Sequence, residues 1–252
     1  MAEAYIVEAL RVAGGRKNGA LAGWHPADLA AEVLNALVER TRIDPGAIDD
    51  VIMGCVNAVG DQSGHIGRSA VLASKLPICV PAVTIDRQCA SSQQAIHFAA
   101  QAVLSGTQDV VIAAGVESMT RVPMGSTRLG GSGSLTRRIR ERFAVEGFSQ
   151  FAGAQIVADK YGIKRGEMDE FALQSHQRAA AATRSEAFKR EIVPVEIETP
   201  RGRRLHEQDE GIRYDATRES IGAVRLLQEG GTLTPALASQ ICDGASGVLL
   251  VS

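Results

Sequence analysis

The sequence has 252 residues, of which 45% are hydrophobic, 22% charged and only 4% aromatic. That length suits one large domain or two small ones, with a core filled mostly by Ala, Val, Leu and Ile. The 27 basic and 29 acidic side chains nearly cancel, so the chain has no global field to attract nucleic acid or an anionic membrane. No stretch is long and apolar enough to span a bilayer, so we expect a globular protein without a membrane or nucleic-acid partner.

The N-terminus and the cysteines indicate the compartment. The first residues open into an apolar run without secretory or transit-peptide character. The four cysteines are widely spaced and form no CxxC pair, so we expect neither a disulfide framework nor a metal site. A reducing cytoplasm is the expected location. The cysteines are Cys55, Cys79, Cys89 and Cys242.

Strand and helix signals alternate through the first half of the chain. We expect helices over residues 26–38, 66–76 and 91–104, because their apolar residues recur at helical spacing. Buried strands are expected over residues 5–10, 51–56, 81–86 and 109–115. This alternation predicts an α/β layered fold, in which helices cover a mixed, mostly parallel sheet.

The pattern changes after residue 117, where Arg, Gly and Ser become more frequent. Here we expect helices over residues 151–161 and 168–188, a polar turn at 164–167 and a strand at 192–197. A buried-strand pattern returns at residues 246–251. The sequence ends within this expected strand, and we interpret that ending as a truncation. We therefore predict a core domain of residues 1–117 plus 239–252 and an inserted α+β loop domain of residues 118–238.

The segment most informative about chemistry is VTIDRQCASSQQA, residues 83–95. A β-branched strand runs into a turn that carries Cys89, and small polar residues open a helix behind it. Helix N–H groups directed at the sulfur favour the thiolate, which is the nucleophilic form of cysteine. The backbone N–H of Cys89 is also placed to donate to an oxyanion on an attached acyl group. The segment predicts a nucleophilic cysteine.

Four stretches of the sequence resemble the thiolase family, in the order in which that family has them. IDRQCASSQQAI is similar to the segment that carries the acylated cysteine, and DVVIAAGVESMTRVP to the strand and Glu-Ser-Met that follow. IRYDATRES resembles a part of the excursion domain that contacts coenzyme A, and LTPALASQICDGASGVLLVS the return to the core. The resemblance implies a thiolase-like fold and an acyl-CoA C-acyltransferase, active in lipid and fatty acid metabolism.

The resemblance also implies roles for particular residues. Cys89 matches the nucleophile that takes the acyl group from a coenzyme A thioester, in thiolytic cleavage or in Claisen condensation. Ser239 matches a contact to the pantetheine arm, Arg213 an arginine at the nucleotide end, and Ser220, more weakly, a neighbouring contact. No bound cofactor or metal is implied, because acyl-CoA and coenzyme A are the substrates. A homodimer or homotetramer is expected, with the Ala-rich helix after Cys89 packed against a symmetry mate.

Two departures from the family pattern affect the expected activity. Phe151 and the two residues after it align where many members have His-Met-Gly, so a bulkier or different acyl group is expected. The family also takes a histidine base, a water-positioning asparagine and a second cysteine from a C-terminal half, which the 252 residues do not contain. We therefore expect the chain alone to be inactive.

The remaining cysteines and histidines have plainer interpretations. Cys55, Cys79 and Cys242 are expected to be small buried side chains. His97 is eight residues after Cys89, roughly 12 Å along a helix, and cannot reach its sulfur. We expect the other histidines to be solvated or structural, in exposed turns and amphipathic helices, because a base needs hydrogen-bond reach. They are His25, His65, His176 and His206.

The sequence leaves three functions open. An acyl-CoA C-acyltransferase fits best, and a ketoacyl synthase-type condensing enzyme, which also acylates a cysteine at a helix start, is the alternative enzyme class. The Glu-Ser-Met segment and the context of Arg213 and Ser239 fit that alternative less well. The third is a catalytically incomplete fragment that binds acyl-CoA or a partner chain. The Arg-rich stretch at residues 137–142 either attracts coenzyme A phosphates or is a solvated loop or subunit contact.

Overall fold

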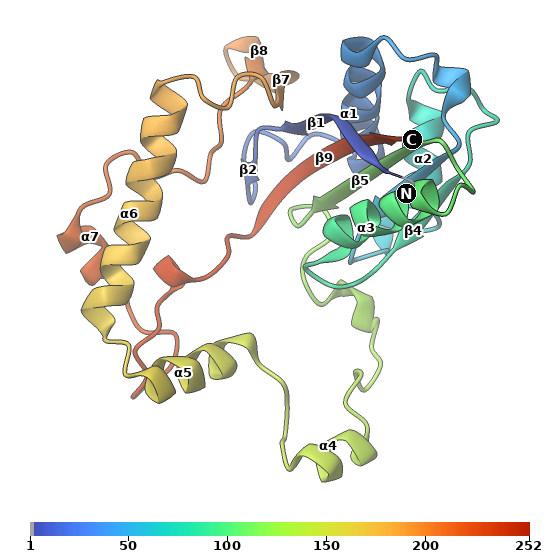
Figure 1. The fold of residues 1–252 in the computed structure, drawn as a ribbon. Helices are drawn as coiled ribbons and strands as arrows, with labels where there is room; N and C mark the ends of the chain where they lie inside the picture. Colours follow the sequence, from blue (N-terminus) through green and yellow to red (C-terminus); the bar gives the residue numbers. More distant parts are fainter. Residues whose placement is uncertain (1–2) are drawn as a thin grey trace. The chain divides into compact units, whose positions relative to one another are not determined.

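The computed structural model describes residues 3–252, and Figure 1 shows its elements. The chain divides into two compact units, which are described separately below. Unit 1 contains Met1–Thr127, Phe188–Gly211 and Ile241–Ser252, and unit 2 contains Arg128–Ala187 and Ile212–Gln240.

Unit 1 is built on a seven-stranded sheet of order β4-β3-β5-β9-β1-β6, with β2 paired to β9. The pairs of β3 with β4 and with β5 are parallel, as is β1 with β6, whereas β9 is antiparallel to β5, β1 and β2. The mixed sheet predicted from the alternating pattern is confirmed. Its strands are β1 (Tyr5–Val12), β2 (Gly15–Arg16), β3 (Asp50–Gly54), β4 (Ala82–Ile85), β5 (Val110–Ser118), β6 (Ile192–Val193) and β9 (Cys242–Val251).

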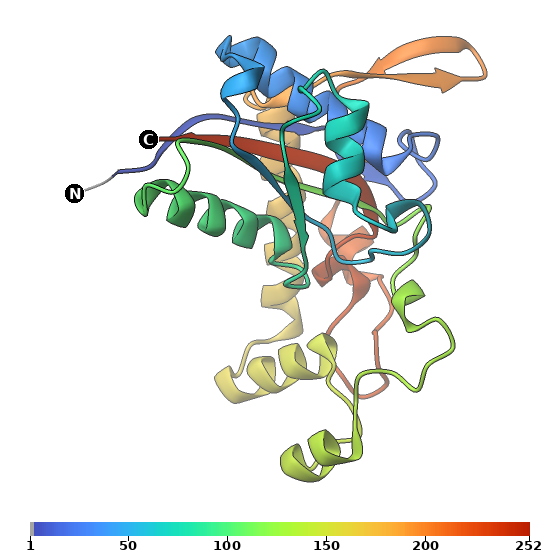
Figure 2. The same ribbon diagram turned by 90° about the vertical axis from the view of Figure 1, so that its right-hand side faces the viewer.

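Three helices cover the sheet of unit 1. Helices α1 (Pro26–Thr41) and α2 (Ile66–Ala73) lie on one face, and α3 (Ser91–Leu104) lies on the other (Figure 2). Each was expected from helical spacing, and α1 does begin with Pro26 in its first turn. Two single-turn 3-10 helices, η1 (Pro45–Ala47) and η2 (Gly60–Gln62), lie in the connections.

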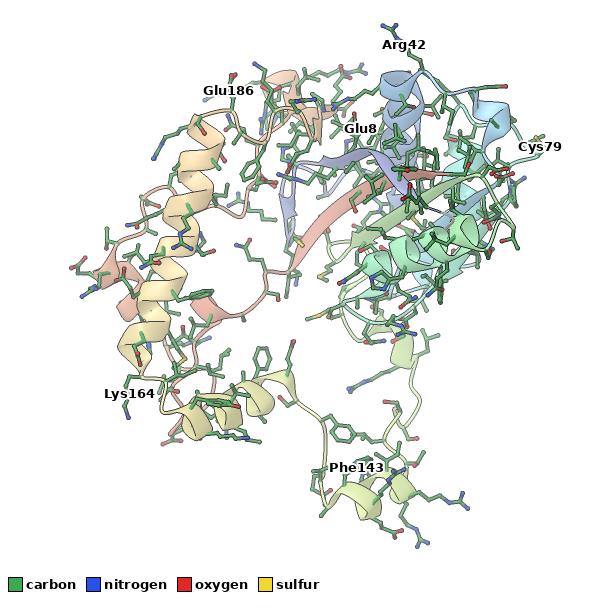
Figure 3. The ribbon with its side chains drawn as sticks, in the orientation of Figure 1. Glu8, Arg42, Cys79, Phe143, Lys164 and Glu186 are labelled. Atoms are coloured by element: carbon green, nitrogen blue, oxygen red, sulfur yellow. The ribbon has the colours of Figure 1, made fainter. Side chains whose placement is uncertain are left out.

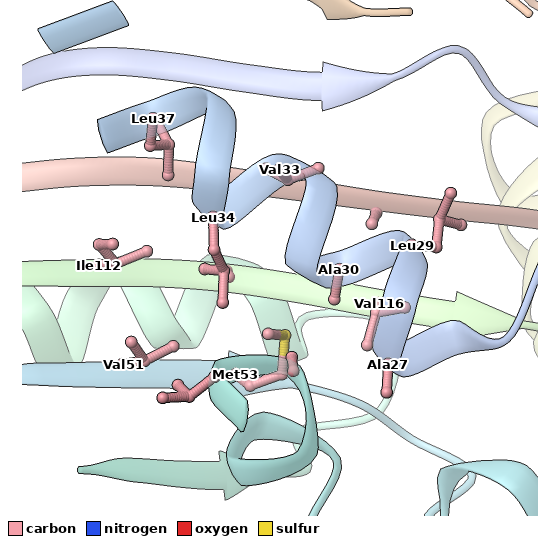
Figure 4. Packing of buried hydrophobic residues seen from close by; sticks show 14 of the residues in the cluster. Ala27, Leu29, Ala30, Val33, Leu34, Leu37, Val51, Met53, Ile112 and Val116 are labelled. Atoms are coloured by element: carbon pink, nitrogen blue, oxygen red, sulfur yellow. The ribbon is translucent and has the colours of Figure 1, made fainter. Parts of the chain in front are cut away.

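The main core lies between α1 and the sheet (Figure 4). Leu34 and Leu37 of α1 are fully buried and belong to one cluster with Val51, Met53 and Ile112 of the two central parallel strands. Burying aliphatic side chains of this size stabilises a fold by about 1.5–3 kcal/mol each. The smaller cluster under α3 contains Ala95 and Ala99, whose short side chains let that helix approach the strands closely.

The segment Phe188–Gly211 lies with the core unit, whereas the sequence placed it in the inserted domain. Its strand β6 pairs in parallel with β1, with Arg11 opposite Ile192, and Arg11 also bonds the carboxylate of Asp209. It carries a two-stranded hairpin of β7 (Val195–Thr199) and β8 (Gly202–His206). The compact units divide the chain at other residues than the expected 117, 118, 238 and 239. The pairing of Ile192 with Arg11, 181 residues earlier, accounts for the placement of Phe188–Gly211 in unit 1.

Unit 2 consists of helices and connecting segments. Its longest helix, α6 (Arg165–Arg184), runs between Lys164 and Glu186, which lie at its two ends in Figure 3. The expected polar turn at 164–167 is the start of this helix, where Glu167 accepts a hydrogen bond from the Lys164 N–H. Ala172 and Leu173 of α6 form a small cluster with Ile221. The other helices are α4 (Arg137–Phe143), α5 (Gln150–Tyr161), α7 (Arg218–Gly222) and the 3-10 turn η4 (Pro235–Leu237), and a further 3-10 turn, η3 (Ser126–Arg128), lies at the boundary with unit 1.

Candidate active site

Cys89 lies where the sequence predicted it, in the turn between β4 and α3. β4 ends at Ile85 and α3 begins at Ser91, so the turn occupies residues 86–90. The Cys89 side chain is exposed. Ala90 is the cap residue of α3, and its methyl group cannot accept a hydrogen bond from the first turn of the helix. The uncapped helix start and the exposed sulfur suit a cysteine that receives an acyl group.

The backbone of this turn is held by two polar side chains. Asp86 accepts a hydrogen bond of 2.6 Å from the backbone N–H of Gln88. Ser91, which is buried, accepts from the Arg87 N–H at 2.9 Å and donates to the Gln88 carbonyl at 2.6 Å. Gln88 has a φ of 49°, a left-handed conformation that costs a non-glycine residue free energy. The bonds from Asp86 and Ser91 offset this cost and fix the direction of Cys89.

Two glycines, one on β3 and one on β5, let the start of α3 approach the sheet. A Cβ added at Gly54, the last residue of β3, would lie 2.5 Å from the backbone nitrogen of Ser92. A Cβ added at Gly115 on β5 would lie 2.5 Å from the Ser92 Cβ. Real Cβ atoms do not come that close, so any larger residue at either position must displace the start of α3. The position of the Cys89 turn therefore depends on steric contact with the sheet.

A polar cluster that the sequence did not reveal lies at the ends of β3 and β5. The Glu117 carboxylate accepts hydrogen bonds from the Val56 N–H at 2.8 Å, from the Asn57 side chain at 3.0 Å and from the Gln62 side chain at 2.8 Å. Gln62 is fully buried and also accepts from the backbone N–H of Ser118. The only signal in the sequence is Glu117 itself, because its partners are about 60 residues away.

Cys55 belongs to this cluster and is chemically different from Cys89. Burial, together with the negative charge of Glu117, raises the pKa of its thiol to about 12. A thiol with that pKa stays protonated at neutral pH and is a poor nucleophile. The expectation of a buried structural cysteine is confirmed for Cys55 but is wrong for Cys79 and Cys242, which are exposed. Figure 3 shows Cys79 at the surface, on the connection that leads to β4.

The histidines of unit 1 have structural surroundings. His25 and His65 cap α1 and α2, each accepting a backbone N–H bond through Nδ1. His97 is exposed on α3. The expectation of exposure is wrong for His206, which is 2% exposed with its Nε2 2.9 Å from the Ala13 carbonyl. His206 is the last residue of β8, and the four residues before it in that strand are exposed, so no local pattern indicated this burial.

The three residues matched to coenzyme A contacts all lie in unit 2. Arg213 and Ser239 are exposed, on the segments before α7 and after η4, and helix α6 packs against both α7 and η4. Ser220 lies in α7, where its hydroxyl accepts from the Thr217 N–H at 2.9 Å and so closes a capping box. The segments that carry these three residues therefore all lie next to helix α6. The Ser220 hydroxyl is already engaged in the hydrogen bond that caps α7.

Neither a metal-binding cluster nor a membrane-spanning helix occurs in residues 3–252. Within that range, no group of three or more His, Cys, Asp and Glu side chains is arranged to hold a metal ion. None of the helices in the same range combines the length and the apolar character needed to cross a membrane.

The family of the chain follows from comparison with known proteins. The model of the thiolase N-terminal domain matches residues 4–252. The chain belongs to the thiolase family. The strand–turn–cysteine–helix segment and the returning strand β9 both lie inside the matched range, so the resemblance noted in the sequence is confirmed.

Three thiolase relatives illustrate the similarity. The chain is 47% identical over its full length to the steroid 3-ketoacyl-CoA thiolase FadA6 of Mycobacterium tuberculosis, of which it covers 62%. It is 38% identical to a β-ketoadipyl-CoA thiolase of Acinetobacter baylyi, with 100% of the chain and 67% of that protein covered. It is 39% identical to an acetyl-CoA acetyltransferase of Chromobacterium violaceum, with 99% and 66% covered. The chain thus spans somewhat under two thirds of the first of these relatives and about two thirds of the other two.

Proposed function

We propose that this chain is the acyl-accepting part of an acyl-CoA C-acyltransferase and that Cys89 is its nucleophile. The observation that carries the proposal is the exposed thiol on a turn held by Asp86 and Ser91, at the start of a helix whose cap residue is Ala90. Membership of the thiolase family supports it.

The proposed chemistry has two half-reactions. The Cys89 thiolate attacks the carbonyl carbon of an acyl-CoA thioester, and the bond to the coenzyme A sulfur breaks, so that coenzyme A leaves and takes up a proton. The oxyanion formed in the attack accepts a hydrogen bond from the backbone N–H of Cys89. In the condensation direction the α-carbon of a second thioester loses a proton to a base, its carbanion attacks the acyl carbonyl carbon, and the bond from that carbon to the Cys89 sulfur breaks. In the reverse direction the Cys89 thiolate attacks the 3-keto carbonyl, the bond between the α- and β-carbons breaks, the released α-carbon takes up a proton, and the thiol of coenzyme A then removes the acyl group from Cys89. A covalent intermediate of this kind gives ping-pong kinetics.

We propose that the base that removes the thiol proton is not one of the histidines that the structure describes in unit 1. His97 is exposed on α3, eight residues beyond Cys89, too far for the hydrogen-bond reach that a base needs. His25 and His65 use Nδ1 to cap helices. We therefore assign activity to the complete native polypeptide and not to this chain alone.

Coenzyme A is proposed to bind to unit 2 as substrate, with no resident cofactor. Arg213 is assigned to the nucleotide end and Ser239 to the pantetheine arm, and both side chains are exposed. Ser220 is the weaker assignment, because its hydroxyl already bonds Thr217.

A bulky acyl group is proposed as the substrate side chain. Among the relatives named above, the steroid 3-ketoacyl-CoA thiolase has the highest identity, 47%. Phe151, on α5, replaces the histidine that many thiolases have near the acyl pocket, and its ring is exposed. We place the enzyme in cytoplasmic lipid metabolism, as a homodimer or homotetramer; the cysteines, all free thiols, suit a reducing compartment.

An electrophilic acyl-CoA analogue tests the proposal. In the complete native polypeptide, a haloacyl-CoA is expected to alkylate Cys89, and coenzyme A in excess should slow the reaction. Labelling of Cys79 or Cys242 instead would refute the assignment. Turnover of carrier-protein thioesters with no turnover of coenzyme A thioesters would favour the ketoacyl synthase-type alternative, and coenzyme A binding without any acyl transfer would favour an incomplete acyl-CoA-binding protein.

A further inference from the structure

Helix α6 holds the segment 212–224 through a row of polar contacts. The backbone N–H of Arg213 donates to Nδ1 of His176 at 3.3 Å. Farther toward the start of the helix, Glu170 pairs with Arg218, and Arg165 donates to the carbonyls of Gly222 and Val224. The contact at Arg213 differs from the others, because it uses a side chain that changes its charge near neutral pH.

His176 has surroundings that favour its neutral form. The side chain is half-buried, and the residues one turn away on α6, Ala172 and Ala180, carry no charge. The charged group that faces it from the packed segment is Arg213, while Arg218 of α7 is engaged by Glu170. The 3-10 turn η4, which also packs on α6, has the uncharged sequence Pro-Ala-Leu. Burial lowers the pKa of His176, and the positive charge of Arg213 lowers it further.

We propose that His176 is a positioning residue for the nucleotide end of coenzyme A: its neutral Nδ1 accepts the Arg213 N–H and so fixes the backbone from which the Arg213 side chain extends. This inference rests on the proposed function, since it takes Arg213 as the contact to the nucleotide. It assigns His176 no part in the chemistry at Cys89.

Protonation of His176 breaks the hydrogen bond between its Nδ1 and the Arg213 N–H. A proton on Nδ1 turns the acceptor into a donor, so that two N–H groups face each other and the bond is lost. The added positive charge also repels the Arg213 guanidinium. Affinity for coenzyme A is therefore constant at and above the ordinary histidine pKa of about 6.5 and falls only when the pH is lowered through the pKa of His176, which lies below that value.

Two variants separate this role from simple packing. His176→Asn places an amide oxygen near the position of Nδ1 and cannot take up a proton, whereas His176→Leu removes the acceptor. In the complete native polypeptide at pH 8, His176→Leu should weaken coenzyme A binding by about 3- to 10-fold, the usual effect of one lost hydrogen bond. His176→Asn should bind nearly as tightly as the wild type at pH 8 and keep that affinity in acid, where the wild type loses it.

The measurement is calorimetric titration with coenzyme A and with adenosine 3′,5′-bisphosphate between pH 5 and 8. The phosphates of the ligand titrate in the same range, near pH 6, but they contribute equally to wild type and His176→Asn, so the difference between the two curves reports His176. Turnover of an acyl-pantetheine thioester, which has no nucleotide, should be the same in all three proteins. Should His176→Leu leave the polypeptide unfolded, the comparison of wild type with His176→Asn still decides the question.

The outcomes distinguish the two proposals. Wild-type protein that binds coenzyme A with the same pH dependence as His176→Asn would overturn the role of His176 and leave the proposed function intact. An equal loss of pantetheine turnover in His176→Leu would also overturn it, because the residue would then act on folding or on the acyl site. Failure of the wild type to bind coenzyme A at any pH would overturn both.

Discussion

The Cys89 turn and the segment 212–224 are both fastened to a helix, but by different forces. The turn of unit 1 is fixed by steric contact, since Gly54 and Gly115 bring Ser92 against the sheet, and by the buried Ser91. The segment of unit 2 is held at the surface by polar groups of α6, among them Glu170 and His176. A nucleophilic side chain needs one fixed orientation. A ligand-binding segment tolerates small changes in conformation, and the polar contacts that hold it respond to pH and salt. Substitutions in the turn should therefore have larger effects than substitutions in the segment.

Gly54→Ala should have the largest effect. Its new Cβ would lie 2.5 Å from the Ser92 nitrogen and 2.6 Å from the Ser91 carbonyl carbon, and backbone atoms cannot turn aside as a side chain can. We expect a loss of about 1–3 kcal/mol in the free energy of unfolding, measured by urea denaturation. Gly244→Ala, on β9, is the matched control, because a Cβ there meets nothing within 4 Å. Equal midpoints for the two variants would contradict the steric account.

Asp209→Asn tests whether the loss of a charged contact inside unit 1 lowers the free energy of unfolding as much as the steric clash at Gly54 does. Asp209 accepts hydrogen bonds from Arg11 at 2.7 and 3.0 Å and from the Gly14 N–H at 2.7 Å. Burial raises the pKa of Asp209, but the bonds from Arg11 and Gly14 outweigh burial and hold the pKa below its usual 3.8. We expect a destabilisation of about 1–3 kcal/mol at pH 7.

The pH dependence of that variant follows from the lowered pKa. The stabilisation by Asp209 is complete above its usual pKa of 3.8 and is lost as the pH falls through the lower value of the folded state. The difference between wild type and Asp209→Asn, followed by denaturation at decreasing pH, should therefore shrink in acid. A difference that grows in acid would show that Arg11 is not what holds the carboxylate. Glu207→Gln, at an exposed neighbouring position, serves as the control.

Ser91→Ala tests the polar part of the turn. The substitution removes the bonds to Arg87 and Gln88 that hold the left-handed residue, and we expect a loss of about 1 kcal/mol. Ser92→Ala is its control, since it keeps the Cβ that packs on Gly115. Alkylation of Cys89 by iodoacetamide should change rate in Ser91→Ala only. An unchanged rate in both would mean that Ser91 does not direct the cysteine.

Glu170→Gln should have the smallest effect of the four on stability. Its pair with Arg218 lies at the surface, where water and salt weaken ion pairs, although the Arg218 hydrogen bond does lower the pKa of Glu170. The change in the denaturation midpoint should be smaller than that of Ser91→Ala and should vanish when the salt concentration is raised. A large decrease in the denaturation midpoint that persists in high salt would contradict the proposed difference between the sterically fixed Cys89 turn and the segment 212–224 held by surface polar contacts.

Local features of the site could be predicted from the sequence. The β-branched run at 83–85 followed by small polar residues indicated strand, turn and helix around Cys89, because each depends on neighbours within a few residues. The contacts that fix the turn against the sheet could not be predicted in this way. Gly54 and Ser92 are 38 positions apart, and a glycine at the end of a strand does not say which backbone approaches it.

Long-range pairing explains the other differences. The strand pattern near residue 192 was recognised, but its parallel pairing with β1 places the segment Phe188–Gly211 in the core unit. His206 was interpreted as exposed, but this last residue of β8 is buried, and its Nε2 lies 2.9 Å from the carbonyl of Ala13, which is 193 residues earlier in the chain. Cys79 is exposed within the connection from α2 to β4, and Cys242 is exposed as the first residue of β9; residue type alone does not indicate either position.

The central claim is that Cys89 alone carries the acyl group. The most direct measurement is to mix the complete native polypeptide with radiolabelled acyl-CoA, quench in acid and locate the label by peptide mass spectrometry. The account predicts one thioester-linked acyl group per chain on Cys89, absent from Cys89→Ala and retained in Cys79→Ala and Cys242→Ala. A label that persists in Cys89→Ala, or acyl transfer without any labelled enzyme, would contradict it.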